Sequence, residues 1–270
     1  MHFGHGTHNA RDEAAWLLTH VLRISHEELA RSASRELTIQ QQRKARRLLE
    51  DRVRTRKPLA YLIHEAWLGD HRFYVDERVI VPRSFIAELL RDRLRPWVGR
   101  PVRRALDLCT GSGCLAILLA PTFPRAAIDA TDISPAALAV ARKNVKAYRL
   151  NRRVKLVRAD LLSGIRGQYD LIVANPPYVG AAAMRRLPPE YHREPRIALA
   201  GGADGLEFVR RILDRATEFL RPGAWLVVEV GHNRRRVERA FPRIPFIWAE
   251  TSAGDDCVFL LSREDLQSRE

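Results

Sequence analysis

The residues best suited to chemistry lie in "DLIVANPPYVG", residues 170–180. Its apolar run, LIVA, is typical of a strand buried on both faces of a parallel sheet. Pro176 and Pro177 follow Asn175, and because neither can donate a ladder hydrogen bond, the strand must end there. A side-chain amide, a rigid backbone and the phenol of Tyr178 therefore meet at the end of a buried strand.

This turn suits the activation of a planar nitrogen. An amide nitrogen is a poor nucleophile because its lone pair is delocalised, so both of its hydrogens must be engaged before it can attack. The side-chain carbonyl of Asn175 and the backbone carbonyl of Pro176 offer two acceptors, and Pro177 stiffens their presentation. Tyr178 can stack on the planar group. The simpler alternative is an ordinary turn between a strand and a loop.

A glycine-rich turn occurs earlier, in "LDLCTGSGCLA". Gly111 and Gly113 let backbone amides approach a ligand at a helix N-terminus, and with Ala116 they satisfy a permissive GxGxxG/A pattern. Nicotinamide dinucleotide and S-adenosylmethionine binders share this weak signal.

Acidic residues end the next two expected strands. Asp132, nineteen residues after Gly113, can accept both ribose hydroxyls of a nucleoside, and Asp160 can meet the exocyclic amine of an adenine. The alternative is a tight turn followed by two helix-capping aspartates. Agreement of three successive strand ends favours a nucleotide-like cofactor.

The elements that position these residues alternate after residue 102. We expect strands in 104–109, 126–132, 154–160, 170–175, 224–231, 246–250 and 257–262, with helices in 113–120, 134–148 and 204–220, the last stopped by Pro222 and Gly223. This order predicts an α/β fold with a doubly wound, mostly parallel sheet and helices on both faces. In such sheets ligands bind at the carboxyl ends of the strands.

The N-terminal third follows a different pattern. Residues 11–56 are predicted to be helical, with Thr38 as an N-cap, followed by a hairpin around Gly69 and Asp70 and a helix over 84–94. The proline- and arginine-rich "RPWVGRPVRR" indicates a boundary. We therefore expect three parts: a helical substrate-recognition domain (1–60), a hairpin and linker helix (61–100), and a catalytic domain (101–270).

The amino-acid composition indicates which kinds of partner and cellular compartment to expect. The net charge of +14 favours a polyanionic partner such as RNA, but 41 arginines against 5 lysines are equally explained by a GC-rich genome. No apolar run is long enough to span a membrane, and no signal peptide is visible, so we expect a cytoplasmic protein. Three cysteines show no metal-ligand spacing, so neither disulfides nor a metal site are expected.

Several segments resemble a known family. "LDLCTGSG", "DISPAALAVA" and "NPPY" resemble class I S-adenosylmethionine-dependent methyltransferases, and more closely the protein-(glutamine-N(5)) methyltransferases. "FGHGTHNARDEA", "FYVDERVIVPRS" and "EYHREPRIALAGGADGL" are similar to the branch that modifies a glutamine of the third protein of the large ribosomal subunit. That branch carries further residues before "FGHGT", so we expect either that part of the recognition domain is missing from this sequence or that the start codon is misassigned.

The resemblance implies roles for individual residues. The methionine end of S-adenosylmethionine would lie against Asp107, Thr110, Gly111, Ser112 and Gly113. Asp132 would hold the ribose and Asp160 would lie near the adenine, and Ile133, Leu161 and Asn175 would also contact the cofactor. The substrate amide would bind Asn175, Pro176, Pro177 and Tyr178, with Glu194 and Pro195 nearby. Cys109 departs from the glycine common in the wider superfamily.

The resemblance implies a methyltransferase acting on the third large-subunit ribosomal protein, with ribosomal RNA as a further contact of the basic surface. One alternative is a nucleic-acid methyltransferase acting on an exocyclic amine, because "NPPY" occurs there too. Another is a release-factor glutamine methyltransferase, which shares "NPPY". A third is a catalytically silent RNA-binding module.

Overall fold

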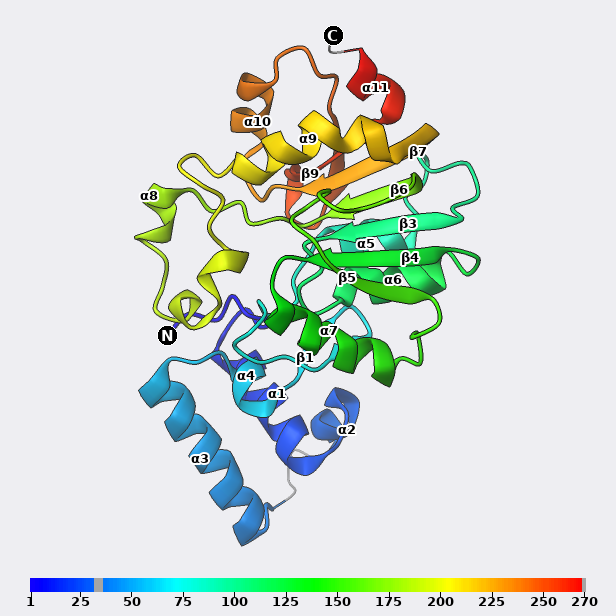
Figure 1. Ribbon diagram of the computed structural model, residues 1–270. Coiled ribbons are helices and arrows are strands. Elements are labelled where there is room, and N and C mark those ends of the chain that lie inside the picture. The colour runs from blue at the N-terminus through cyan, green and yellow to red at the C-terminus, as the bar shows by residue number, and fades with distance from the viewer. Residues whose placement is uncertain (32–35, 269–270) are drawn as a thin grey trace.

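A seven-stranded sheet forms the centre of the computed structural model, which describes residues 1–31 and 36–268. The strand order is β5-β4-β3-β6-β7-β9-β8, and β5, β4, β3, β6 and β7 run parallel (Figure 1). The last two strands form an antiparallel edge. The bounds are β3 Arg104–Leu108, β4 Ala127–Asp132, β5 Val154–Arg158, β6 Tyr169–Ala174, β7 Leu220–Glu229, β8 Ile247–Thr251 and β9 Gly254–Ser262.

Helices cover both faces of this sheet. One face packs against α5 (Ile86–Arg91), α6 (Cys114–Thr122) and α7 (Pro135–Ala147), and the other against α9 (Glu207–Phe219), α10 (Arg234–Ala240) and α11 (Arg263–Gln267). In β6, Leu171 and Val173 join the first core while Ile172 and Ala174 join the second, and all four are fully buried. This period-two alternation explains the uninterrupted apolar run in the sequence.

The N-terminal residues form a helical part below the sheet in Figure 1. It contains α1 (Ala10–Leu22), α2 (His26–Arg31), α3 (Ile39–Thr55), α4 (Leu59–Ile63) and the hairpin strands β1 (Ala66–Leu68) and β2 (His71–Phe73). Thr38 caps α3 through a capping box, as the sequence predicts. Trp16 of α1 and Phe73 of β2 belong to the same apolar core as α6 and α7, so the two parts share buried surface.

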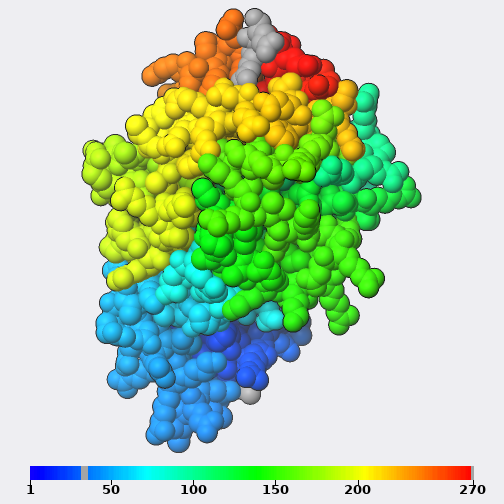
Figure 2. Space-filling view, in the orientation of Figure 1, coloured from blue at the N-terminus to red at the C-terminus, as the bar shows by residue number. Residues whose placement is uncertain are grey.

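A long connection between β6 and α9 lies over the carboxyl edge of the sheet. It holds three short helices, α8 (Ala181–Met184), η1 (Tyr191–Arg193) and η2 (Arg196–Ala198). The start of the chain lies beside this connection, where the backbone N–H of His2 donates to Glu190 at 2.9 Å. Figure 2 shows the N-terminal part as the lower lobe of the molecule, in contact with this yellow segment.

The structure differs from the sequence expectation at the junction between α9 and β7. The helix before β7 ends at Phe219, and the residues expected to stop it, Pro222 and Gly223, lie within β7. The end of the helix was therefore expected to within one residue, whereas the strand begins earlier than expected, because the register shift between Tyr169 and Leu171 of β6 leaves Pro222 at an irregular position where proline is tolerated. No helix among the described residues is long and apolar enough to cross a membrane.

Candidate active site

Two pockets meet at Asn175 on the carboxyl edge of the sheet. The larger has a volume of about 250 Å³ and the smaller about 180 Å³. Asn175, Ile80 and Ala198 line both of them. The larger pocket is otherwise formed by Arg78, Val79, Cys109, Gly111, Asp132, Ile133, Ser134, Ala137, Ala159, Asp160, Leu161, Pro177, Ile197, Glu207, Phe208 and Arg211. A molecule in either pocket therefore has Asn175 in its wall.

Asp132 is fixed by backbone donors at the end of β4. The N–H of Gly111 donates to its Oδ2 and the N–H of Ser134 to its Oδ1, both at 2.9 Å. Burial raises the pKa of Asp132, and these N–H groups act against that rise. Each carboxylate oxygen keeps a further lone pair, so the group can accept the two hydroxyls of a ribose in the larger pocket.

The other residues of the glycine turn lie beneath this pocket. Asp107, Thr110, Ser112 and Gly113 do not line it. Asp107 accepts from the hydroxyl of Thr110 at 2.5 Å and from the N–H of Ala116 at 3.0 Å, which joins β3 to α6. Burial raises the pKa of Asp107 to about 7, although both hydrogen bonds lower it. These residues therefore support the turn, and their expected contact with the cofactor stays a prediction.

The lack of a side chain at Gly113 allows α6 and α7 to pack close to each other. The φ of Gly113 is +83°, and a Cβ there would lie 3.2 Å from the Cβ of Ala141 in α7. A side chain at this position would therefore push the two helices apart.

The far end of the larger pocket is apolar with one ion pair. Ile133 is 45% exposed in the wall of this pocket and offers an apolar surface for a flat ring. Leu161 and Phe208 also line this pocket. Asp160 accepts from Nη2 of Arg211 at 2.6 Å. Of the two members of this ion pair, the sequence predicted only Asp160 as a site residue, because no motif indicated Arg211 on α9.

The Asn-Pro-Pro-Tyr turn divides its side chains between the pockets. Pro176 and Tyr178 line the smaller pocket, whereas Pro177 lines the larger. Nδ2 of Asn175 donates to the backbone carbonyl of Arg83 at 3.3 Å. With its nitrogen engaged in this way, the carbonyl end of Asn175 is left to accept from a ligand.

Tyr178 is held by the loop that follows β7. Nδ2 of Asn233 donates to the carbonyl of Tyr178 at 3.2 Å, and a Cβ at Gly231 would lie only 2.7 Å from Cε2 of the Tyr178 ring. Burial and the nearby Glu229 carboxylate raise the pKa of Tyr178, so its hydroxyl stays protonated at neutral pH. Tyr178 can therefore stack or donate, but it cannot act as a base.

Arg83 and Tyr191 complete the smaller pocket. The guanidinium of Arg83 lies 5.3 Å from the ring centroid of Tyr191, a cation–π distance. Sequence reasoning assigned neither residue a role, although both stand in segments with a family resemblance, "VIVPRS" and "EYHREP".

Glu194 supports this pocket from outside. Its buried carboxylate accepts from both terminal nitrogens of Arg83, at 2.7 and 2.6 Å, and from the N–H of Val81 at 2.9 Å. Burial alone would raise its pKa, but the charge and hydrogen bonds of Arg83 outweigh burial and bring the pKa to about 2. Glu194 and Pro195 line neither of the two pockets. Glu194 instead fixes Arg83, whose carbonyl orients Asn175.

The N-terminal part contacts the same connection through buried charges. Glu190 is fully buried and pairs with Arg52 at 3.4 Å and Arg56 at 2.8 Å. Arg52 also pairs with Glu13 of α1 at 2.9 Å. The ring of His5 contacts that of Tyr191 in a tilted arrangement, with the ring centroids 4.5 Å apart, and its Nε2 lies 3.5 Å from Glu194. Residues far apart in sequence thus set the wall of the smaller pocket.

These features define a class I S-adenosylmethionine-dependent methyltransferase. They are the parallel sheet, the glycine turn after β3, the aspartates at the ends of β4 and β5, and the amide turn after β6. A methyltransferase small domain model matches residues 86–187, and a PrmC N-terminal domain model matches residues 4–63. Solved structures agree on the fold. The hMettl16 catalytic domain in complex with a MAT2A 3'UTR hairpin has a TM-score of 0.54 at 19% identity, covering 81% of this chain and 79% of that one. A methyltransferase from Pyrococcus furiosus also has a TM-score of 0.54 at 19% identity, covering 82% and 98%.

Curated proteins share higher sequence identity with this chain than these solved structures do. Ribosomal protein uL3 glutamine methyltransferase from Neisseria meningitidis is 52% identical, over 100% of this chain and 90% of that one. The Burkholderia pseudomallei protein of the same name is 48% identical, over 98% and 89%. The chain therefore belongs to the family of ribosomal protein uL3 glutamine methyltransferases. The larger pocket fits S-adenosylmethionine, the cofactor of this class, because it offers an anchored carboxylate for a ribose and an exposed apolar side chain for an adenine.

Proposed function

We propose that this protein transfers a methyl group to the side-chain amide nitrogen of a glutamine in ribosomal protein uL3, with Asn175 at the point of reaction. The observation that supports this most is the position of Asn175 in the wall shared by the two pockets. The larger pocket holds the nucleoside, and the smaller takes the amide group of the glutamine. Family membership at 45–52% identity supports the choice of protein substrate.

The chain's own residues prepare the nitrogen for attack. The Asn175 carbonyl and the Pro176 backbone carbonyl accept the two amide hydrogens, which holds the glutamine nitrogen with its lone pair directed toward the larger pocket. Bound S-adenosylmethionine supplies the methyl group on a positively charged sulfur. Asn175 and Pro176 would hold the glutamine nitrogen against this methyl group, and the nitrogen would release one of its two protons to solvent as the methylated product leaves.

Neutral residues stabilise the site during transfer. Tyr178 and Pro176 contact the planar amide and exclude water from it. Arg83 also lines the smaller pocket, but its charge is neutralised by Glu194, so it does not oppose the positive charge that develops on the nitrogen. The proposed roles of Asp160 and Ile133 are contacts with the adenine edge and face.

The basic surface of the N-terminal part suggests that the enzyme also contacts RNA. α3 exposes Arg43, Lys44, Arg46, Arg47 and Arg54, and Arg52 is its single fully buried side chain. We propose that ribosomal RNA near uL3 contacts this helix, in the cytoplasm where ribosomes assemble. Free uL3 carries no such RNA, so its methylation should fall less steeply with salt than the activity of an RNA-binding enzyme, because few phosphates need be neutralised.

A competition assay tests the proposal. The enzyme is supplied with S-adenosylmethionine, purified uL3, a release factor and ribosomal RNA together, over a salt series. Mass spectrometry should find one added methyl group on a glutamine-containing peptide of uL3. A methylated release-factor peptide would assign the chain a different protein substrate, and a methyl group on RNA would contradict protein methylation. Asn175→Ala in the same mixture should form the uL3 product about 100-fold more slowly.

A further inference from the structure

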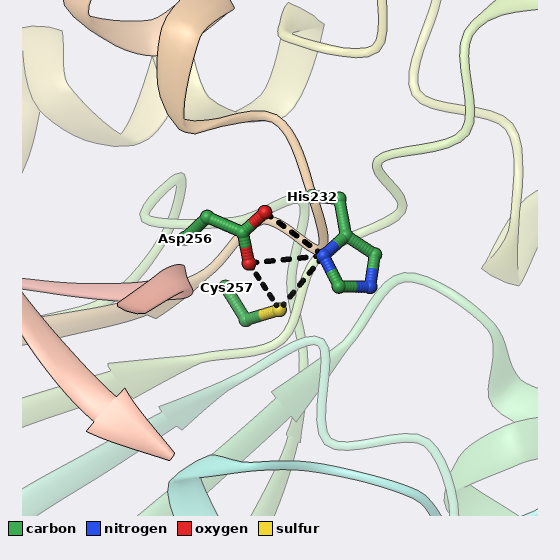
Figure 3. Close-up of side chains that lie close together, drawn as sticks. All are labelled: His232, Asp256 and Cys257. Atoms are coloured by element: carbon green, nitrogen blue, oxygen red, sulfur yellow. Dashed lines mark hydrogen bonds and ion pairs between the residues drawn. The ribbon is translucent and has the colours of Figure 1, made fainter. Parts of the chain in front are cut away.

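A second cluster of reactive side chains lies beside the loop that follows β7, outside both pockets. His232 belongs to that loop, and Asp256 and Cys257 are consecutive in β9 (Figure 3). Nδ1 of His232 lies 2.9 and 3.0 Å from the two carboxylate oxygens of Asp256 and 3.6 Å from Sγ of Cys257. Sγ of Cys257 lies 3.3 Å from Oδ1 of Asp256.

The geometry distinguishes two kinds of chemistry. In a Cys-His-Asp catalytic relay the imidazole uses one nitrogen for the acid and the other for the thiol. Here the same atom, Nδ1 of His232, faces both the carboxylate and the sulfur. Such a cluster cannot pass a proton from the thiol through the ring to the acid. Three lone-pair donors that point at one another are instead the arrangement of metal ligands, as Figure 3 shows.

The separations match those of one small cation. Zinc bonds of about 2.3 Å to sulfur and about 2.0–2.2 Å to nitrogen and oxygen place tetrahedral ligand atoms roughly 3.3–3.6 Å apart. The sulfur–nitrogen and sulfur–oxygen distances of 3.6 and 3.3 Å already lie in this range. Only the contact between His232 and Asp256, at 2.9 Å, must open by a few tenths of an ångström. The His232 side chain is 69% exposed, so it is free to move that far.

The ligand types select the metal. A thiolate and an imidazole with one carboxylate suit zinc, whereas calcium and magnesium prefer oxygen ligands alone. A thiolate and a carboxylate also neutralise a divalent charge. We propose that His232, Asp256 and Cys257 bind one zinc ion, with the fourth position open to solvent on the exposed side of His232.

The surroundings hold one of the ligands, Cys257, in place. Cys257 is buried, and its carbonyl accepts from the N–H of Val230 at 2.8 Å, at the point where β9 leaves its pairing with β7. Burial, followed by the hydrogen bond to Asp256, raises the pKa of the Cys257 thiol to about 12, so zinc binding must displace the thiol proton to solvent. The simple alternative is a His–Asp ion pair with a weak thiol donor.

Zinc at this position would fix the loop that holds Tyr178. His232 lies between Gly231, which packs against the Tyr178 ring, and Asn233, which donates to the Tyr178 carbonyl. We therefore expect zinc to stabilise the folded protein, because a ligand that binds only the folded state raises its stability by mass action.

Cobalt substitution tests the site directly. The full-length protein is treated with a chelator under reducing conditions and titrated with Co²⁺, whose thiolate charge-transfer band and tetrahedral visible bands report the ligands. We expect one equivalent to bind, and one equivalent of Zn²⁺ to abolish the bands. Cys257→Ser should remove the thiolate band, and His232→Ala and Asp256→Asn should weaken affinity by about tenfold or more.

Matched controls separate this site from other ligands. Cys114→Ser, at a cysteine outside the cluster, should keep the band and the stoichiometry. Should Cys257→Ser fail to fold, the exposed His232→Ala variant provides the same comparison through affinity and through loss of the zinc-induced rise in melting temperature. Absence of stoichiometric binding by the wild-type protein, or an unchanged thiolate band in Cys257→Ser, would overturn the proposal and leave an ion pair.

Discussion

Glu194 and Arg83 form a bidentate ion pair, with the two N–O distances at 2.7 and 2.6 Å and the Glu194 side chain completely buried. The pair joins the connection after β6 to the segment before α5. Through its backbone carbonyl, Arg83 also receives the side-chain amide of Asn175 at 3.3 Å. The orientation of the proposed reactive amide therefore depends on a charge pair more than a hundred residues apart in the chain.

Removing the charge of Glu194 should destabilise the protein. Glu194→Gln leaves Arg83 with an uncharged partner, and breaking a buried pair costs about 3 kcal/mol. Urea unfolding at neutral pH measures this loss. Glu218→Gln is the matched control, because Glu218 pairs with Arg215 at the surface and should change the unfolding free energy by no more than about 0.5 kcal/mol. An equal loss of unfolding free energy in the two variants would contradict the structural role proposed for Glu194.

The same pair should give an acid-dependent stability. The pKa of Glu194 is about 2 in the folded protein against 4.5 for the free side chain. Its contribution is therefore complete above pH 4.5 and is lost as the pH falls from 4.5 toward 2. The difference in unfolding free energy between wild type and Glu194→Gln should be nearly constant from pH 7 to pH 5 and should shrink as the pH falls from 4.5 to 3. A difference that stays constant over this lower range would contradict the linkage.

Asp132 should control cofactor affinity. Asp132→Ala removes charge-assisted hydrogen bonds of about 1.5–3 kcal/mol, which corresponds to roughly 10- to 100-fold weaker binding of S-adenosylmethionine. Calorimetry measures the change. Asp129→Asn is the control, since Asp129 pairs with Arg104 and with Tyr169 at the start of β6, away from the pocket. Unchanged affinity in Asp132→Ala would exclude this residue from the site.

Asn175 should act on turnover more than on cofactor binding. Asn175→Ala deletes one preorganised acceptor and should lower kcat about 100-fold, with S-adenosylmethionine affinity nearly unchanged. Asn151→Ala, at an exposed turn, serves as the control. A variant at position 175 with a near wild-type rate would contradict the mechanism proposed for the amide.

Gly231 offers a test of Tyr178 without altering the tyrosine. Gly231→Ala would place a Cβ 2.7 Å from the Tyr178 ring and should displace it, lowering kcat about tenfold through misplaced contacts with the amide. Gly164→Ala is the matched control, because Gly164 also has a positive φ but no atom lies within 4 Å of its built Cβ. Both variants carry the backbone strain of about 1 kcal/mol. Only Gly231→Ala should change the rate.

Much of the catalytic half follows from local sequence. The buried run before Asn175, the proline turn and the alternation of strands and helices each depend on neighbouring residues, and the structure confirms the parallel sheet that they predict. The start of β7 was misplaced because Pro222 and Gly223 form a helix-stopping signal, and only the pairing of Leu220 with Tyr169 of β6 shows that the strand begins before them.

The walls of the smaller pocket and the metal-ligand cluster could not be predicted in this way. Arg83, Tyr191 and Glu194 meet only because the connection after β6 folds back over the N-terminal part. His232 and Cys257 are 25 residues apart, a spacing that matches no local motif, and it is the antiparallel return of β9 beside β7 that brings them together. Local sequence determined which strand ends carry donors and acceptors, because strand period and turn chemistry act over a few residues. The tertiary structure decided which distant side chains share buried space, because burial and charge pairing depend on the packing of the whole chain.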